Sequence, residues 1–175
     1  MAGSIVTRKG DSGTTRLLFG EQVFKGHPRV CVYGALDEAG ALLTAARAQL
    51  AQTWAETLKS RQRLLIQLSA ELACLPAHWP ALEAKGKLVS SEDLASLDQA
   101  CAALEGPELA FDEWIVDLPP GPALVDVART VVRRAEAQLW AQLAKEVRPE
   151  TKACLNRFSD YLWLFARAAA RASAT

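Results

Sequence analysis

The sequence has little histidine, and its cysteines are not clustered. Its 175 residues include 2 histidines and 4 cysteines. His27 and His78 stand alone, and no set of His, Asp and Glu has metal-ligand spacing. The cysteines are too scattered for a zinc knuckle or a redox pair; they are Cys31, Cys74, Cys101 and Cys154. We therefore expect no protein-bound metal, and a cytoplasmic protein with free, mostly buried thiols.

An excess of charge of one sign is also missing. The chain carries 20 Lys and Arg against 20 Asp and Glu, so it lacks the basic surplus of a nucleic-acid or membrane-surface binder. No apolar run approaches the roughly 20 residues of a membrane span. Residues 1–6 contain no basic segment followed by an apolar one, so we expect no export signal. Neither nucleic acid nor membrane is expected as a partner.

Helical periodicity dominates what is present. Ala-rich and Leu-rich stretches lie between prolines, and apolar residues recur there every three or four positions. This pattern predicts four long helices, over residues 35–51, 57–74, 122–145 and 150–172. A shorter fifth helix is expected to start at Ser90–Asp93, which has capping residues, and to end near Leu104. The prediction is an all-α five-helix bundle, with residues 76–91 as an internal linker.

The first 33 residues lack this periodicity. Short β-prone runs at 5–7 and 17–19 flank a polar loop that contains glycine. We interpret residues 1–33 as an extended arm and residues 34–175 as the bundle, together forming one structural domain.

The arm loop, residues 7–16, has the composition of an anion site. Gly10 and Gly13 let the backbone turn so that N–H groups converge, and hydroxyls and cations stand beside them. No Gly-Lys-Ser/Thr follows, so this is not a Walker loop. A solvated polar hairpin is the alternative interpretation.

Polar residues on the predicted helices form a second candidate group. Arg129, Arg133 and Glu136 share one face of a helix whose other faces are apolar. Arginines enclosed there would need an anionic partner, either Asp37 or a phosphate; an exposed stripe of ion pairs is the alternative. Asn156 lies inside the last helix, where asparagine has poor propensity. No serine has an evident histidine base, so a hydrolytic triad is unsupported.

These segments resemble the PduO-type ATP:cob(I)alamin adenosyltransferases. Residues 7–15 (T-R-K-G-D-S-G-T-T) are similar to that family's Thr-Lys-x-Gly-Asp-x-Gly-x-Thr opening. Residues 25–38 resemble its Lys…Arg-Val-Glu-Ala-Tyr-Gly-x-x-Asp-Glu stretch, and 68–73 its Gly-Ala-Asp-Leu-Ala segment. Residues 128–136 match Ala-Arg-x-x-x-Arg-Arg-Ala-Glu, and 155–162 match Leu-Asn-Arg-Leu-Ser-Asp-Tyr-Leu. The resemblance implies a five-helix bundle that forms a homotrimer, with ATP and cobalamin bound between subunits.

The resemblance also implies a reaction and a set of site residues. Reduced cobalt attacks the 5′-carbon of ATP, triphosphate leaves with its Mg²⁺, and adenosylcobalamin forms. A cobalamin reductase and an adenosylcobalamin-dependent acceptor enzyme are the implied partners. The implied ATP-binding residues are Thr7, Arg8, Lys9, Gly10, Ser12, Gly13, Thr15, Lys25, Arg133, Glu136 and Asn156. Arg133, Arg129, Asp37 and Trp114 are implied to be catalytic: Asp37 pairs with Arg129 across the subunit boundary, and Trp114 shields the lower face of the corrin.

The chain departs from the family pattern mainly on the corrin side. Cys31 replaces a glutamate, Ala39–Gly40 replaces Leu-Asn, Asp126 replaces a histidine, and Ala137 replaces an arginine. The loop at 114–121 aligns with the family's Phe-Ile-Leu-Pro-Gly-Gly only with a gap. A non-catalytic cobalamin-binding or ATP-binding carrier or regulator is therefore the alternative to an active transferase.

Overall fold

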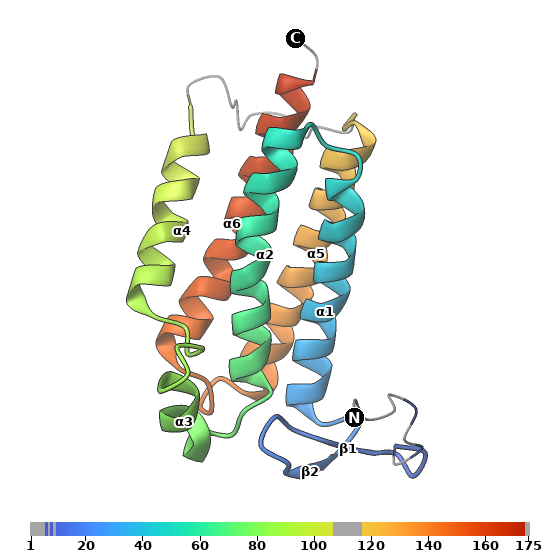
Figure 1. Cartoon of the computed structure of the whole chain (residues 1–175), viewed down its shortest axis with the longest axis vertical. Coiled ribbons are helices and arrows are strands. Elements are labelled where there is room, and N and C mark those ends of the chain that lie inside the picture. Colours follow the sequence, from blue (N-terminus) through green and yellow to red (C-terminus); the bar gives the residue numbers. More distant parts are fainter. Residues whose placement is uncertain (1–5, 7, 9, 107–116, 174–175) are drawn as a thin grey trace.

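The computed structural model describes residues 6, 8, 10–106 and 117–173. Within them the chain is an all-α bundle, as predicted, with a two-stranded sheet at its N-terminal end (Figure 1). The bundle helices are α1 (Pro28–Arg47), α2 (Gln52–Leu72), the shorter α4 (Ser91–Leu104), α5 (Pro120–Gln142) and α6 (Pro149–Ala172). The stretch predicted as a linker contains two short helices, η1 (Pro76–His78) and α3 (Trp79–Glu83).

The apolar stripes found in the sequence form the core. α1 packs against α2 and α5, and α6 packs against α4 and α5. Leu36, Leu43, Leu68, Val132 and Phe158 are almost fully buried between these helices. Each comes from a position where an apolar residue recurs every three or four residues, so one face of each helix turns inward. Among the described helices, none combines the length and apolarity that a membrane span requires.

The helix starts show how local sequence sets the boundaries. α4 begins with a capping box in which Ser90 and Asp93 each accept a hydrogen bond from the other's backbone N–H. The first bundle helix begins at Pro28, earlier than the predicted start near Ala35. Proline suits the first turn of a helix, and the His27 side chain accepts a hydrogen bond from the Arg29 N–H at 3.2 Å. The signal lay in this proline and cap, not in the apolar spacing.

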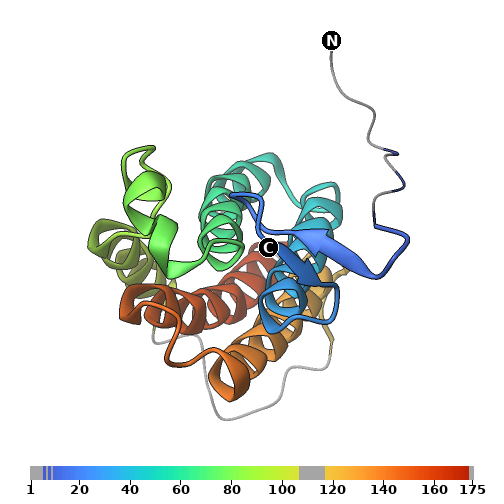
Figure 2. The same cartoon turned by 90° about the horizontal axis from the view of Figure 1, so that it is seen from below.

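The arm contains an antiparallel hairpin, with β1 (Thr14–Arg16) paired to β2 (Gln22–Phe24). The predicted strand at 17–19 is wrong: these residues form the turn side of the hairpin, and Leu17 is buried. Leu18 donates its N–H to the Ala73 carbonyl at 2.8 Å, which ties the turn to the end of α2. The apolar run therefore anchors the arm and adds no strand. Figure 2 shows the hairpin across that end of the bundle.

A buried arginine joins three parts of this same end. Arg29 is 1% exposed. Its Nη1 donates to the carbonyls of Leu72 and Cys74 at 3.2 and 2.9 Å, and its Nη2 donates to the Glu146 carbonyl at 3.0 Å. Carbonyls at or just beyond the end of a helix have no backbone N–H of a following turn to accept from, and here the guanidinium is their donor. Arg29 thereby fixes the base of the arm against α2 and the α5–α6 connection.

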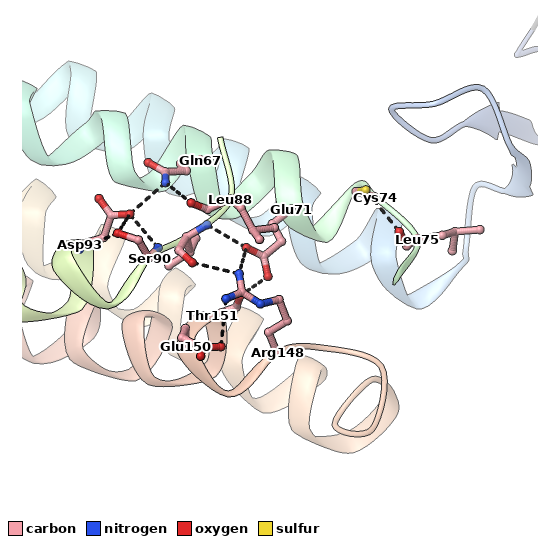
Figure 3. A network of polar contacts seen from close by, with 11 residues as sticks. Gln67, Glu71, Cys74, Leu75, Leu88, Ser90, Asp93, Arg148, Glu150 and Thr151 are labelled. Atoms are coloured by element: carbon pink, nitrogen blue, oxygen red, sulfur yellow. Dashed lines mark hydrogen bonds and ion pairs between the residues drawn. The ribbon is translucent and has the colours of Figure 1, made fainter. Parts of the chain in front are cut away.

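A second polar network holds α2, α4 and α6 together (Figure 3). Buried Glu71 accepts hydrogen bonds from the Val89 N–H at 3.0 Å and from the Thr151 hydroxyl. Arg148 lies 3.4 Å from the same carboxylate and donates to the Val89 carbonyl at 2.9 Å. Glu71 and Arg148 are thus paired with each other and with neighbouring groups of the bundle, so we assign the network a structural role. Of the free cysteines, Cys74, Cys101 and Cys154 are buried and Cys31 is exposed, in line with the prediction.

Candidate functional site

The arm loop forms a polar pocket at the hairpin. The pocket has a volume of about 660 Å³ and is lined by Gly10, Ser12, Thr15 and Lys25 among others. A Cβ placed on Gly10 would lie 3.1 Å from the Lys25 Nζ, so the Lys25 ammonium group lies close to the backbone at Gly10. The structure therefore gathers these four predicted ATP-binding residues around one hollow. Hydroxyls, an ammonium and a glycine-rich backbone form an arrangement suited to an anion.

The backbone of the loop depends on Gly13. Its φ of +81° is a conformation that side-chain-bearing residues rarely adopt. The Gly13 N–H bonds to the Gly10 carbonyl at 3.2 Å, and the Gly13 carbonyl accepts the Lys25 N–H at 2.9 Å. These two hydrogen bonds close the arm loop and connect it to Lys25, shortly before α1 begins at Pro28. Arg8 is exposed, with its carbonyl accepting the Asp11 N–H at 3.3 Å; Thr7 and Lys9 lie outside the described residues.

The second predicted group lies on the face between α5 and α6. Asn156 Nδ2 donates to Glu136 Oε1 at 3.1 Å, so these two residues meet across the helices. Arg133, one turn before Glu136, is exposed, and it forms no hydrogen bond or ion pair within the described part of the chain. Arg134 points elsewhere and pairs with Glu38 on α1. Of the two adjacent arginines, Arg133 has the unengaged guanidinium.

Arg129 has a partner that the sequence analysis did not propose. Its Nε donates to Asp126 Oδ1 at 2.8 Å, and Arg167 Nη1 lies 3.3 Å from the same oxygen. Asp37 is exposed on α1 and is not the internal partner of Arg129. Burial raises the pKa of Asp126, but the hydrogen bonds and charges of the two arginines outweigh it and hold that pKa below its usual value. The i, i+3 spacing of Asp126 and Arg129 was the available signal.

Asp37 instead lines a groove between α1 and α2. The groove has a volume of about 690 Å³, and Tyr33, Ala41 and Ile66 are among its other lining residues. Ile66 is 70% exposed, a high value for a large apolar side chain. Across the described residues, no hydrogen bond or ion pair connects the arm pocket with Arg133, Glu136 or Asn156. The two groups of predicted ATP-binding residues thus remain separate within one chain.

Trp114 lies outside the described residues. Over the described ranges, no cluster of His, Cys, Asp and Glu has the composition of a metal site.

Comparison with known proteins covers nearly the whole chain. The family model for cobalamin adenosyltransferase matches residues 5–169. The chain is 39% identical over 176 residues to the corrinoid adenosyltransferase PduO of Salmonella typhimurium, covering 94% of this chain and 49% of that protein. It therefore spans about half the length of that relative. A corrinoid adenosyltransferase of Citrobacter freundii is 34% identical, with 93% of each chain covered.

A solved structure has the same fold. It is a variant of the PduO-type ATP:corrinoid adenosyltransferase from Lactobacillus reuteri, complexed with cobalamin and ATP. Its TM-score is 0.86 at 25% sequence identity, with 98% of this chain and 96% of that chain covered. The structural match therefore extends over nearly the whole length of both chains.

Proposed function

The chain belongs to the cobalamin adenosyltransferase family, and we propose that it transfers the 5′-deoxyadenosyl group of ATP to the cobalt of reduced cobalamin. The products are adenosylcobalamin and triphosphate. The observation that carries the proposal is the arm pocket, where Gly10, Ser12, Thr15 and Lys25 converge on one hollow. These residues fall within the matched region, and their chemistry suits a triphosphate.

The reaction explains why the site needs no side-chain base. Cobalt supplies the electron pair that forms the bond to the ribose 5′-carbon, and the bond from that carbon to the triphosphate oxygen breaks. The triphosphate leaves with the electrons of that bond, so no proton has to move. The protein's task is to orient ATP and stabilise the charge that develops on the leaving group. Cations and N–H donors perform this task, and the arm pocket and Arg133 provide them.

Each group of predicted residues has a place in this scheme. Ser12, Thr15 and Lys25 bind the triphosphate from the arm, and Arg133 binds it from the bundle, beside the Glu136–Asn156 pair. Because no carboxylate is among the described residues that line the arm pocket, Mg²⁺ would enter as a part of MgATP, with triphosphate and water oxygens as its ligands. The corrin side would use Asp37, Arg129 and Trp114.

We propose that the active form is a homotrimer whose sites lie between subunits. The arm pocket and the α5–α6 face are separate within one chain, and a triphosphate must contact both. The groove that contains Asp37 and Ile66 is apolar and open, so a second copy of the chain is the occupant that would cover it. A cytoplasmic location, a cobalamin reductase and an acceptor enzyme complete the proposal; free thiols suit a reducing compartment.

The trimer can be tested at Ile66. A charge there would be buried without a partner on assembly, so Ile66→Glu should convert the trimer to monomers and remove most activity. Thr57→Glu, on an exposed position of the same helix, should leave both unchanged. Sedimentation velocity measures the outcome. A wild-type chain that is active as a stable monomer would contradict the proposal.

The role of Trp114 gives another prediction. An indole that closes the lower face of the corrin would exclude the axial ligand and make cobalt easier to reduce. Trp114→Ala should then impair turnover that starts from cob(II)alamin far more than turnover that starts from cob(I)alamin, with ATP affinity unchanged. Parallel losses with both cobalt states, together with a large drop in melting temperature, would assign Trp114 to packing.

The function itself can be tested with the purified chain. ATP, Mg²⁺ and chemically reduced cobalamin should give adenosylcobalamin, which is followed by its absorbance change. Binding of ATP and cobalamin without turnover would contradict the proposal and favour the carrier or regulatory alternative, which the changed loop at 114–121 suggests.

A further inference from the structure

Asp126 lies between two arginines on the inner side of the α5–α6 pair. Its carboxylate accepts from Arg129 through Nε at 2.8 Å and through Nη2 at 3.4 Å. It also accepts from Arg167 Nη1 at 3.3 Å. The carboxylate is 27% exposed and the Arg129 side chain 18%, so the cluster is largely enclosed.

The guanidinium of Arg129 is held by one edge only. Nε and Nη2 form its side edge, and both of them are directed at Asp126. A guanidinium is a rigid planar fork, so fixing one edge also fixes the direction of the other. Nη1, which lies on the terminal edge, makes no hydrogen bond or ion pair within the described residues. Arg129 therefore keeps donors available in one defined direction.

Asp126 is itself fixed by Arg167. The Arg167 side chain is 6% exposed. Its Nη1 also donates to the Trp163 carbonyl at 3.2 Å, and its guanidinium carbon lies 3.8 Å from the centre of the Trp163 ring. Stacking and burial leave this arginine little freedom, so its charge gives the carboxylate a fixed support. Trp163 thus holds Arg167, Arg167 holds Asp126, and Asp126 holds Arg129.

We infer that Asp126 is a positioning residue, which holds Arg129 so that its terminal edge is presented to an acceptor outside this chain. The inference rests on the proposed function, because it gives Arg129 a role in turnover. A carboxylate in this place differs from a neutral side chain in two respects: it accepts both bonds of the side edge, and it offsets the repulsion between the two arginines. The amide oxygen of an asparagine could accept only part of these hydrogen bonds, and it would not offset the repulsion between the two arginines.

The test compares Asp126→Asn with a matched control, Asp98→Asn. Asp98 is an exposed carboxylate on α4 that pairs with Arg157 on α6, so its variant also breaks a carboxylate–arginine pair between helices. We expect Asp126→Asn to lower kcat by a factor between about 10 and 100, since small misplacements of a reacting group have effects of this size. KM for ATP should stay within about twofold of wild type. Asp98→Asn should behave as wild type.

A double variant separates positioning from a merely structural role. If Asp126 acts through Arg129, adding Asp126→Asn to Arg129→Ala should produce no further loss of kcat. A structural role would instead lower kcat and thermal stability together, and the loss would persist in the Arg129→Ala background. Asp126→Glu retains the charge but moves the carboxylate, so it should fold like wild type and still lose kcat. This variant carries the test if Asp126→Asn does not fold.

The outcomes distinguish this inference from the proposed function. Adenosyl transfer by the wild type together with unchanged kcat in Asp126→Asn or Asp126→Glu would overturn the inference and leave the function in place. Additive losses in the double variant would overturn it as well. A wild-type chain that binds both substrates but does not transfer the adenosyl group would overturn the proposed function, and with it the role of Asp126 in turnover.

Discussion

Arg133→Ala should lower kcat/KM for ATP by a factor between about 10 and 100, whereas the neighbouring Arg134→Ala should have little effect. The reason is the direction of each side chain. Arg133 has no partner in the described part of the chain, on the face where Asn156 bonds Glu136. Arg134 is already paired with Glu38 on a different face. A charge-assisted hydrogen bond to phosphate contributes about 1.5–3 kcal/mol, which corresponds to the expected factor.

The adjacent position makes Arg134→Ala a close control, because both variants remove the same side chain from one turn of α5. Steady-state kinetics with varied ATP and saturating reduced cobalamin measures the difference. Arg133→Lys should recover part of the activity, since it restores the charge but not the planar fork. Equal losses in the two alanine variants would contradict the assignment of Arg133 to the triphosphate.

Arg29→Ala should lower the free energy of unfolding by about 3 kcal/mol or more. The substitution removes the donors of three carbonyls, those of Leu72, Cys74 and Glu146, at the end of the bundle. Each buried carbonyl left without a partner costs about 1–3 kcal/mol, and water that enters the space recovers a part of this. Arg29 lies where the arm joins α1, so ATP binding should weaken together with stability.

Arg63→Ala is the matched control for stability, since Arg63 is an exposed arginine on α2. Its effect should remain within about 0.5 kcal/mol, as is usual for surface substitutions. Urea unfolding followed by circular dichroism measures both variants. If Arg29→Ala were as stable as Arg63→Ala, the tie between the arm, α2 and the α5–α6 connection would not contribute to the fold.

The sequence was sufficient for the bundle because the period of its apolar residues is local information. Residues such as Leu43, Leu68 and Phe158 are spaced to lie on one helix face, and they are buried in the structure. The hairpin was predicted less well. Leu17 has an apolar side chain typical of a strand, but it is buried as an anchor beside the turn, because the end of the bundle offers it a place. The burial site of Leu17 exists only in the folded bundle, so local propensity cannot predict it.

The candidate site likewise combines features that local sequence predicts with features that depend on tertiary packing. The glycine positions predicted the turn of the arm loop, and Gly13 indeed has the positive φ that favours glycine. The meeting of Glu136 and Asn156 depends on how two helices pack, so sequence spacing within either helix could not reveal it. Asp126 was noted only as a departure from the family. Its contact with Arg167 is set by the packing of α6 on α5, and it became visible only in three dimensions.

The central claim is that one triphosphate site is formed by the arm of one subunit and the bundle of another. Mixing two inactive variants tests it most directly. Lys25→Ala damages only the arm, and Arg133→Ala only the bundle. In randomly mixed trimers, about one quarter of the sites combine an intact arm with an intact bundle from different chains. The account predicts that an equal mixture, refolded together, regains about a quarter of wild-type activity; activity no higher than the mean of the two variants alone would contradict it.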